Sequence, residues 1–359
     1  MLKLGITSIR ELDRPHRWLG RERHASFLLL EPLAREGHAD PATYDTLVAR
    51  VRMPNGTWKQ TAAGRLRMVD DALVGVLERM HAPGCALSVL DLGASTGVTS
   101  VDLYETLSRR WSVEFTATDL YRDVFAVSSR ARRWAVVLAD GGEVLQHVLG
   151  RFVLPGQLQE SAAYPTNRAL KRWSGRVLVP RARAALASDH AARDRPYFTP
   201  SDVGGLVVQR LPFFSLRCLD LIRHTARFRF LVHDVTEPPP TTATIVRAVN
   251  IITSEYFDVP TATRAIANAL QAVEPGGYFV AGRSRGLDAA AMRATVFRVH
   301  GNVAEVVARV GDGYEFESTV LSQAAGARGS KRLLTGATRG RAVCVHTGVP
   351  RGPVPLVEP

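Results

Sequence analysis

The segment most informative about the fold class is Val89-Leu-Asp-Leu-Gly-Ala-Ser-Thr-Gly97. It overlaps the apolar run 86–90, which is short enough for a buried parallel strand, and it leads into a helix-like segment at 98–110. Gly93 and Gly97 allow backbone angles and a close ligand approach that a Cβ would prevent. Because open α/β folds bind ligands outside the carboxyl ends of their strands, the sequence predicts a binding loop here.

Two further acidic residues close predicted strands. Asp119 follows the strand 111–118, and Asp234 follows the strand 228–233. A carboxylate at Asp119 can accept hydrogen bonds from both ribose hydroxyls of an adenosine, and Asp234 can read an adenine amino group. Each also has a purely structural interpretation: Asp119 as a helix N-cap or a solvated loop residue, and Asp234 as a turn residue before Pro238-Pro-Pro240.

Outward from this centre, the periodicity predicts an alternation of helices and strands. The expected elements are a helix at 64–80, a hairpin of 134–139 and 144–148, a helix at 261–273, strands at 244–250 and 276–282, and antiparallel strands at 295–299, 303–310 and 314–321. Residues 150–200 read as irregular, with one short helix near 179–187. The pattern predicts a Rossmann-like, doubly wound α/β sheet of about seven strands with an antiparallel final hairpin.

The expected division of the chain has three parts. Residues 1–86 form an N-terminal helical extension, residues 87–323 form the Rossmann-like domain with an insertion at about 135–226, and residues 324–359 form a basic tail. The tail is rich in Gly, Arg and Pro, a composition typical of disorder.

Through these motifs, the sequence resembles the class I S-adenosylmethionine-dependent methyltransferases over about residues 88–321. The motifs fall in the family's order: the glycine loop at 89–97, the ribose acid Asp119, the adenine-contacting His233, Asp234 and Val235, the segment 249–257 that faces the reaction centre, and the Pro-Gly-Gly turn at 274–280. A weaker similarity to CheR-type methyltransferases rests on Asn250 and on Tyr256-Phe257. Val249 stands where those enzymes have an arginine, and two extra residues separate Asn250 from the Tyr-Phe pair.

The resemblance implies that the cofactor is S-adenosylmethionine and that the chain is an enzyme of methyl transfer. The implied cofactor residues are Asp91, Gly93, Ala94, Ser95, Thr96, Gly97, Asp119, Leu120, His233, Asp234, Val235 and Asn250. A hydroxyl or amine acceptor would need a base, for which Glu255, Tyr256 and His233 are candidates. Alternatively, Tyr256 packs in the core and Glu255 is a solvated residue before a helix.

Two other function classes remain open. The loop 93–97 superficially resembles a dinucleotide loop of an NAD(P)-dependent oxidoreductase, but the G-x-G-x-x-G spacing and a Tyr-x-x-x-Lys pair are absent. A non-catalytic binding module with the same fold is the second alternative.

The net charge and composition of the chain limit the classes of partner that it is expected to bind. The net charge is +12, and residues 151–230 hold 14 Lys/Arg against five Asp/Glu. Basic composition without a reading motif argues against nucleic acid as the partner. We expect the insertion to cover the acceptor, and Arg168, Lys171, Arg172 and Arg176 to serve an anionic acceptor or an anionic membrane surface.

Three cysteines, Cys85, Cys218 and Cys344, are far apart and form no CxxC pair, so neither a disulfide framework nor a metal site is indicated. No apolar run approaches the roughly 20 residues that span a bilayer. Charged residues stand where a signal peptide would need an apolar segment. A cytoplasmic protein is therefore expected.

Overall fold

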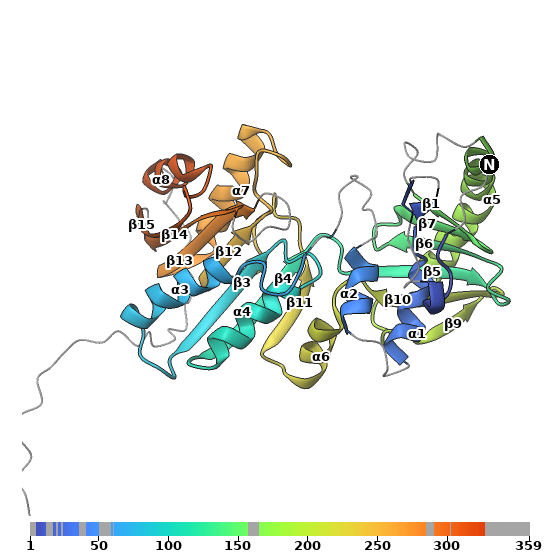
Figure 1. Ribbon diagram of the computed structural model, residues 1–359, viewed down its shortest axis with the longest axis horizontal. Helices are drawn as coiled ribbons and strands as arrows, with labels where there is room; N and C mark the ends of the chain where they lie inside the picture. Colours follow the sequence, from blue (N-terminus) through green and yellow to red (C-terminus); the bar gives the residue numbers. More distant parts are fainter. Residues whose placement is uncertain are drawn as a thin grey trace, which may run out of the picture.

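The computed structural model describes residues 5–11, 17–18, 21–22, 24–35, 41–49, 59, 61–156, 165–284, 291–301 and 303–326. Two large β-sheets organise them, a seven-stranded mixed sheet and a six-stranded antiparallel sheet, which lie side by side (Figure 1). A two-stranded ribbon, β1 (Arg17–Trp18) and β2 (Arg21–Glu22), completes the β-structure of the described residues.

The seven-stranded sheet has the order β11-β4-β3-β12-β13-β14-β15. Its strands are β3 (Ala86–Leu92), β4 (Ser112–Asp119), β11 (Phe228–Val232), β12 (Ala243–Val249), β13 (Val273–Ser284), β14 (Met292–His300) and β15 (Val303–Val310). The first five are parallel, whereas β14 and β15 are antiparallel to their neighbours. The predicted doubly wound sheet with an antiparallel final hairpin is therefore confirmed.

Helices cover both faces of this sheet, because its central strands are apolar on both sides. Leu87 and Val89 of β3 belong to one apolar cluster and Leu90 and Leu92 to another. The first cluster takes in α3 (Arg67–Met80), α4 (Val98–Ser108) and α6 (Leu216–His224), and the second takes in α7 (Val259–Gln271) and α8 (Glu317–Gly326). The chain reverses its direction of travel between β3 and β12, which is where open α/β sheets bind ligands.

The prediction of a third antiparallel strand at residues 314–321 is wrong. Tyr314 and Phe316 precede α8, and Val320 lies inside it and is fully buried. The apolar positions 316 and 320 are one helical turn apart, and the Tyr314 hydroxyl donates to the Ile252 carbonyl at 2.7 Å. These contacts anchor a helix, and a short segment of this kind cannot be told from a strand by its apolar pattern alone.

The six-stranded sheet is inserted between β4 and β11 and has the order β8-β7-β6-β5-β10-β9. Its elements are β5 (Asp123–Ser129), β6 (Trp134–Ala139), β7 (Val144–Leu149), β8 (Phe152–Pro155), β9 (Pro200–Val203), β10 (Leu206–Pro212) and the covering helix α5 (Pro165–Ser188). The predicted hairpin of β6 and β7 is confirmed. The inserted sheet begins with β5, twelve residues earlier than residue 135 of the expected insertion.

Helix α5 corrects the expectation of an irregular stretch at 150–200. It has 24 residues and contains Pro180. A proline inside a helix removes one backbone hydrogen bond and usually breaks or kinks it. Here Leu178 and Val179 precede the proline, Ala182 and Leu186 follow it, and all four are buried under the helix. Packing on both sides of Pro180 thus outweighs the missing hydrogen bond.

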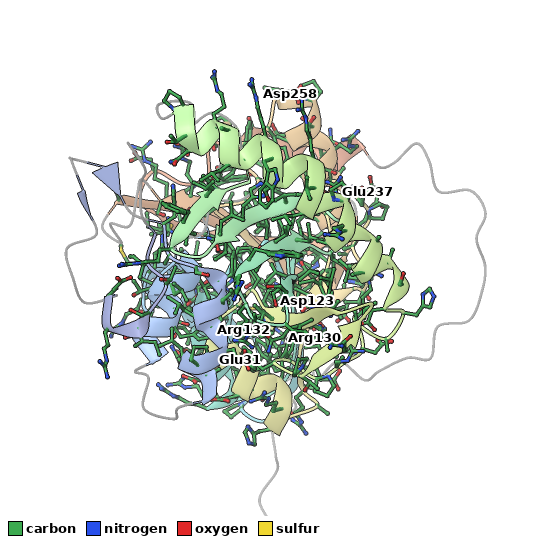
Figure 2. The ribbon with its side chains drawn as sticks, turned by 90° about the vertical axis from the view of Figure 1, so that its right-hand side faces the viewer. Glu31, Asp123, Arg130, Arg132, Glu237 and Asp258 are labelled. Atoms are coloured by element: carbon green, nitrogen blue, oxygen red, sulfur yellow. The ribbon has the colours of Figure 1, made fainter. Side chains whose placement is uncertain are left out.

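The expected helical extension, residues 1–86, is only partly helical among its described residues. It contains η1 (Ile9–Glu11), η2 (Phe27–Leu29), α1 (Leu30–Arg35), α2 (Pro41–Ala49) and the correctly predicted α3. Its first part lies against the inserted sheet: the Gln146 side chain accepts from the Phe27 amide at 3.0 Å and donates to the Ala25 carbonyl at 2.8 Å. The labelled pair Arg132 and Glu31, 2.8 Å apart, adds a second link (Figure 2).

Within the described residues, no helix has both the length and the apolar character needed to cross a membrane. The expected basic tail lies outside the described residues from 327 onward.

Candidate functional site

The loop between β3 and α4 adopts the backbone that its glycines allow. Gly93, Ser95 and Gly97 all have positive φ, at 69°, 59° and 76°. A Cβ on Gly93 would lie 2.6 Å from the Ile251 side chain, and one on Gly97 would lie 2.9 Å from the Cys218 sulfur. Helix α4 starts after Gly97 without a side-chain cap, so the positive end of its dipole is available to an anionic ligand group.

Gly93→Ala is expected to cost about 1–3 kcal/mol more stability than Gly84→Ala, because only the first substitution forces a Cβ against a side chain. Gly84 also has a positive φ, 81°, but nothing lies within 4 Å of the position of its Cβ. Gly84→Ala therefore measures the backbone strain alone. Urea unfolding of both variants gives the difference, and equal losses would show that the approach to Ile251 is not close.

Asp119 ends β4 and holds this loop in place. Its Oδ2 accepts the Ser95 amide at 2.8 Å, and its Oδ1 accepts the Tyr121 amide at 3.1 Å. The Lys59 ammonium lies 3.0 Å from Oδ1. A carboxylate offers about four acceptor positions, so these donors leave about one for a ligand hydroxyl.

Lys59 belongs to the site, although no sequence pattern pointed to it. Its side chain is 4% exposed. The ammonium donates to the Ser95 carbonyl at 3.1 Å and to the Tyr121 carbonyl, and it lies 4.5 Å from the centre of the Phe213 ring. Burial lowers the pKa of Lys59, and the charge of Asp119 opposes this effect. A single lysine with no periodic apolar neighbours gives no signal that could link it to a strand end 60 residues away.

Asp91, expected in the cofactor site, is engaged inside the fold. Arg247 donates to its Oδ1 from Nε at 2.8 Å and to its Oδ2 from Nη2 at 2.7 Å, and Ser100 donates to Oδ2 at 2.6 Å. Arg247 also donates to Asp70 of α3 at 3.0 Å. Asp70, Asp91 and Arg247 are all buried. Asp91 therefore ties β3 to β12, and both of its oxygens are engaged in the buried interior.

The buried triad of Asp70, Asp91 and Arg247 shifts the pKa values of its members. Burial raises the pKa of Asp70 to about 7, against the opposing effect of Arg247. Burial lowers the pKa of Arg247, but the two carboxylates outweigh it and the pKa is raised overall. One arginine thus faces two carboxylates, of which Asp70 is protonated at moderately acidic pH.

Large apolar side chains are exposed where β4 and β11 end. Leu120 is 48% exposed and Val232 is 44% exposed. His233 comes next, and its amide donates to the Asp119 carbonyl at 3.0 Å. The His233 Nε2 is buried and has no hydrogen-bond partner among the described residues. Burial lowers the pKa of this imidazole, and the neighbouring Asp234 opposes the shift.

Asp234 adopts the turn that was its structural interpretation. Its Oδ1 accepts the amide of Thr236 at 2.9 Å and the hydroxyl of Thr236 at 2.8 Å, and the residue is exposed. Val235 is buried in the apolar core. Of the three expected adenine-contacting residues, His233 and Asp234 therefore lie at the sheet edge and Val235 lies inside.

Tyr121 brings the inserted sheet to the same edge. Burial raises the pKa of its phenol, and the carboxylates of Glu143, Asp119 and Asp234 raise it further. Glu143 belongs to the turn between β6 and β7. A turn of the inserted sheet is therefore close to the ends of β4 and β11.

The site candidates after β12 are the expected cofactor residue Asn250 and the catalytic candidates Glu255 and Tyr256. Asn250 has a φ of 63°, and its Oδ1 accepts the Ser284 amide at 2.6 Å. Glu255 forms an ion pair with Arg283 and is 64% exposed. Tyr256 is 48% exposed, so its interpretation as a core residue is wrong. Glu255 is thus held in an ion pair, whereas the Tyr256 phenol forms no hydrogen bond or ion pair within the described residues.

Three buried polar atoms at this edge have no hydrogen-bond partner among the described residues: Thr96 Oγ1, His233 Nε2 and Thr253 Oγ1. They follow β3, β11 and β12, respectively. A buried polar group without a partner costs about 1–3 kcal/mol, so a ligand that supplied partners there would be stabilised. The remaining member of the expected loop, Ala94, donates its amide to the Thr118 carbonyl at 2.8 Å and is buried.

No protein-family model matches the sequence, and no curated protein matches it. Among solved structures, the chain is similar to an O-methyltransferase family protein from Burkholderia thailandensis, with 14% identity and a TM-score of 0.29 over 76% of this chain and 48% of the other. It is also similar to an N-methyltransferase from Bradyrhizobium japonicum in complex with S-adenosylhomocysteine, with 12% identity and a TM-score of 0.28 over 66% and 71% of the chains.

A third similar structure is an S-adenosylmethionine-bound amino pentose methyltransferase from Micromonospora echinaspora, with 12% identity and a TM-score of 0.26 over 68% of each chain. The matches cover about half of the first such structures, 54% of a methyltransferase chain from Haloferax volcanii and 48% of the Burkholderia chain. At these identities and TM-scores the likenesses carry no argument about activity.

Proposed function

We propose that the carboxyl edge of the seven-stranded sheet binds S-adenosylmethionine and that the chain transfers its methyl group to an acceptor. One observation carries the proposal: the carboxylate of Asp119 stands between a glycine loop and two exposed apolar side chains, Leu120 and Val232. A nucleoside needs an acceptor for its ribose hydroxyls and apolar walls for its base, and this edge supplies both.

Different residues would bind different parts of the cofactor. Asp119 would accept one ribose hydroxyl at its remaining acceptor position, and Leu120 and Val232 would contact the base. The first amides of α4 and the Thr96 hydroxyl would bind the carboxylate of the methionyl part. Asp91 and Val235 are excluded from this set, because both are committed to the interior.

The cofactor supplies a methyl group already activated by a positive sulfur, so the protein mainly has to align the acceptor and exclude water. Tyr256 and His233 are the side chains that would take a proton from a hydroxyl or amine acceptor. The lowered pKa of His233 keeps its imidazole neutral near pH 7, as a base requires. A small-molecule or protein carboxylate, the other acceptor class, would need no base.

Asp119→Asn is expected to weaken S-adenosylmethionine binding by about 1.5–3 kcal/mol, or about 10- to 150-fold in Kd, because hydrogen bonds to a charged acceptor contribute that much. Isothermal titration calorimetry measures the change. Asp312→Asn is the matched control, since Asp312 is 77% exposed and pairs with Arg293 in a turn after β15. Thermal unfolding of both variants checks that the fold is retained.

The same titration decides between the function classes. Binding of NAD or NADP without S-adenosylmethionine would favour the oxidoreductase, and binding of none of the three would favour a non-catalytic module. Either result, or equal affinity in wild type and Asp119→Asn, contradicts the proposal.

A further inference from the structure

Helix α5 presents a strongly basic outer face. Its 24 residues contain six basic side chains and no acidic one. Lys171 is buried and faces the sheet. The other five are exposed, namely Arg168, Arg172, Arg176, Arg181 and Arg183. Arg183 donates to the Gly142 carbonyl. A helix with this many exposed cations and no anion of its own is suited to an anionic surface.

An apolar stripe runs along the same outer face. Its members are three or four residues apart and all are exposed: Ala169, Trp173, Val177, Pro180 and Ala184. Trp173 is 48% exposed and Val177 is 38% exposed. Residues four apart are neighbours on a helix, so these two form a continuous patch. Arg168, Arg172 and Arg176 border the stripe on one side, and Arg181 borders it on the other.

The position of α5 makes this face accessible to a large flat surface. Figure 1 shows the helix on the outside of the inserted sheet, at the end of the molecule away from the seven-stranded sheet, and Figure 2, seen from that end, shows it in the foreground. The opposite side of the helix is fastened to the inserted sheet through Leu178, Ala182 and Leu186. The inner side of the helix is therefore packed on the sheet, and its outer side is exposed.

We propose that the outer face of α5, defined by the apolar stripe and its bordering arginines, docks onto an anionic lipid bilayer. A tryptophan beside a small apolar patch fits the interface between headgroups and acyl chains. The flanking arginines extend their charged ends to lipid phosphates while their stems cover apolar surface. A nucleic acid fits less well, because the apolar stripe would desolvate its phosphates without offering them hydrogen-bond donors or charges in return. This docking does not depend on the proposed methyl transfer.

Electrostatic attraction is expected to contribute most of the affinity of this face for anionic lipid. Each arginine near an anionic surface strengthens membrane binding about fivefold. The variant Arg168→Gln/Arg172→Gln/Arg176→Gln is therefore expected to bind vesicles containing phosphatidylglycerol about 100-fold more weakly than wild type. The matched control Arg67→Gln/Arg229→Gln/Arg264→Gln removes three exposed arginines of the seven-stranded half. It has the same net charge and should bind like wild type.

The experiment is cosedimentation of the full chain with vesicles of phosphatidylcholine, with and without phosphatidylglycerol, at low and high salt. Binding is expected only to the anionic vesicles and only at low salt. As a second measurement, brominated lipids should quench the fluorescence of wild type more than that of Trp173→Phe. This comparison tests the orientation without relying on the triple variant.

Three outcomes would overturn the proposal. The first is no binding to anionic vesicles. The second is equal binding by the α5 variant and the control variant, which would place the contact elsewhere. The third is binding to DNA or RNA oligonucleotides that the α5 variant loses, without vesicle binding, which would assign the face to nucleic acid.

Discussion

Arg247→Met should lower the free energy of unfolding by about 3–5 kcal/mol, because it leaves two buried carboxylates without their cation. Arg247 is 1% exposed and bonds both oxygens of Asp91 and one of Asp70. Methionine fills a similar volume, so the substitution creates little new cavity. Chemical denaturation followed by circular dichroism measures the change.

Arg309→Met is the matched control for this prediction. Arg309 also pairs with a carboxylate, Glu317 at 2.7 Å, but its own side chain is 53% exposed. An exposed pair of this kind contributes at most about 1 kcal/mol. Similar losses in the two variants would show that the Arg247 pairs are no stronger than surface pairs. Adding Asp70→Asn and Asp91→Asn to Arg247→Met should recover part of the loss, because no uncompensated charge then remains.

Asp70 is expected to make the stability of the protein depend on pH between about 4 and 7. Its pKa is 3.8 in the unfolded chain and about 7 in the fold, where burial disfavours the charged form. A raised pKa contributes stability that is complete below the unfolded value and is lost as the pH rises through the folded value. Asp70 therefore stabilises the fold at pH 4 and no longer does so at pH 8.

Asp70→Asn removes this dependence. Relative to wild type, the variant should be about equally stable at pH 4 and more stable at pH 8, by up to about 4 kcal/mol. Urea unfolding at both pH values measures the difference between the two proteins, in which all other titrating groups cancel. Asp71→Asn is the control, because Asp71 is the neighbouring residue but is 67% exposed. A difference from wild type that stays constant with pH would contradict the shift at Asp70.

The buried triad also bears on the candidate site. Asp91 immediately precedes the glycine loop, and Arg247 lies three residues before Asn250. The loop and the end of β12 are thus joined by the same ion pairs that join β3, β12 and α3. Variants of Arg247 and Asp70 should consequently be compared for cofactor affinity only under conditions where both are fully folded.

Local patterns in the sequence were enough to predict the central sheet. The strands β3, β4 and β12 are buried on both faces. The continuous apolar run of β3 and the alternating pattern of β4 are both recognisable strand signals. The same reasoning placed the glycine loop and Asp119 at one edge, because parallel strands end on the same side. It failed at α5, where Pro180 and many arginines hid a helix whose buried positions depend on the sheet beneath.

The amino-acid sequence alone thus predicts the order of strands and helices around residues 89–97 and the acidic residues that end those strands. Only the tertiary structure decided which of those acids remain available: Asp91 is paired with Arg247 from a strand 156 residues away, whereas Asp119 faces the loop and Lys59. The physical reason is that burial and ion pairing depend on contacts between distant segments. Periodicity records which face of an element is apolar, but not which charged side chain from elsewhere will meet it.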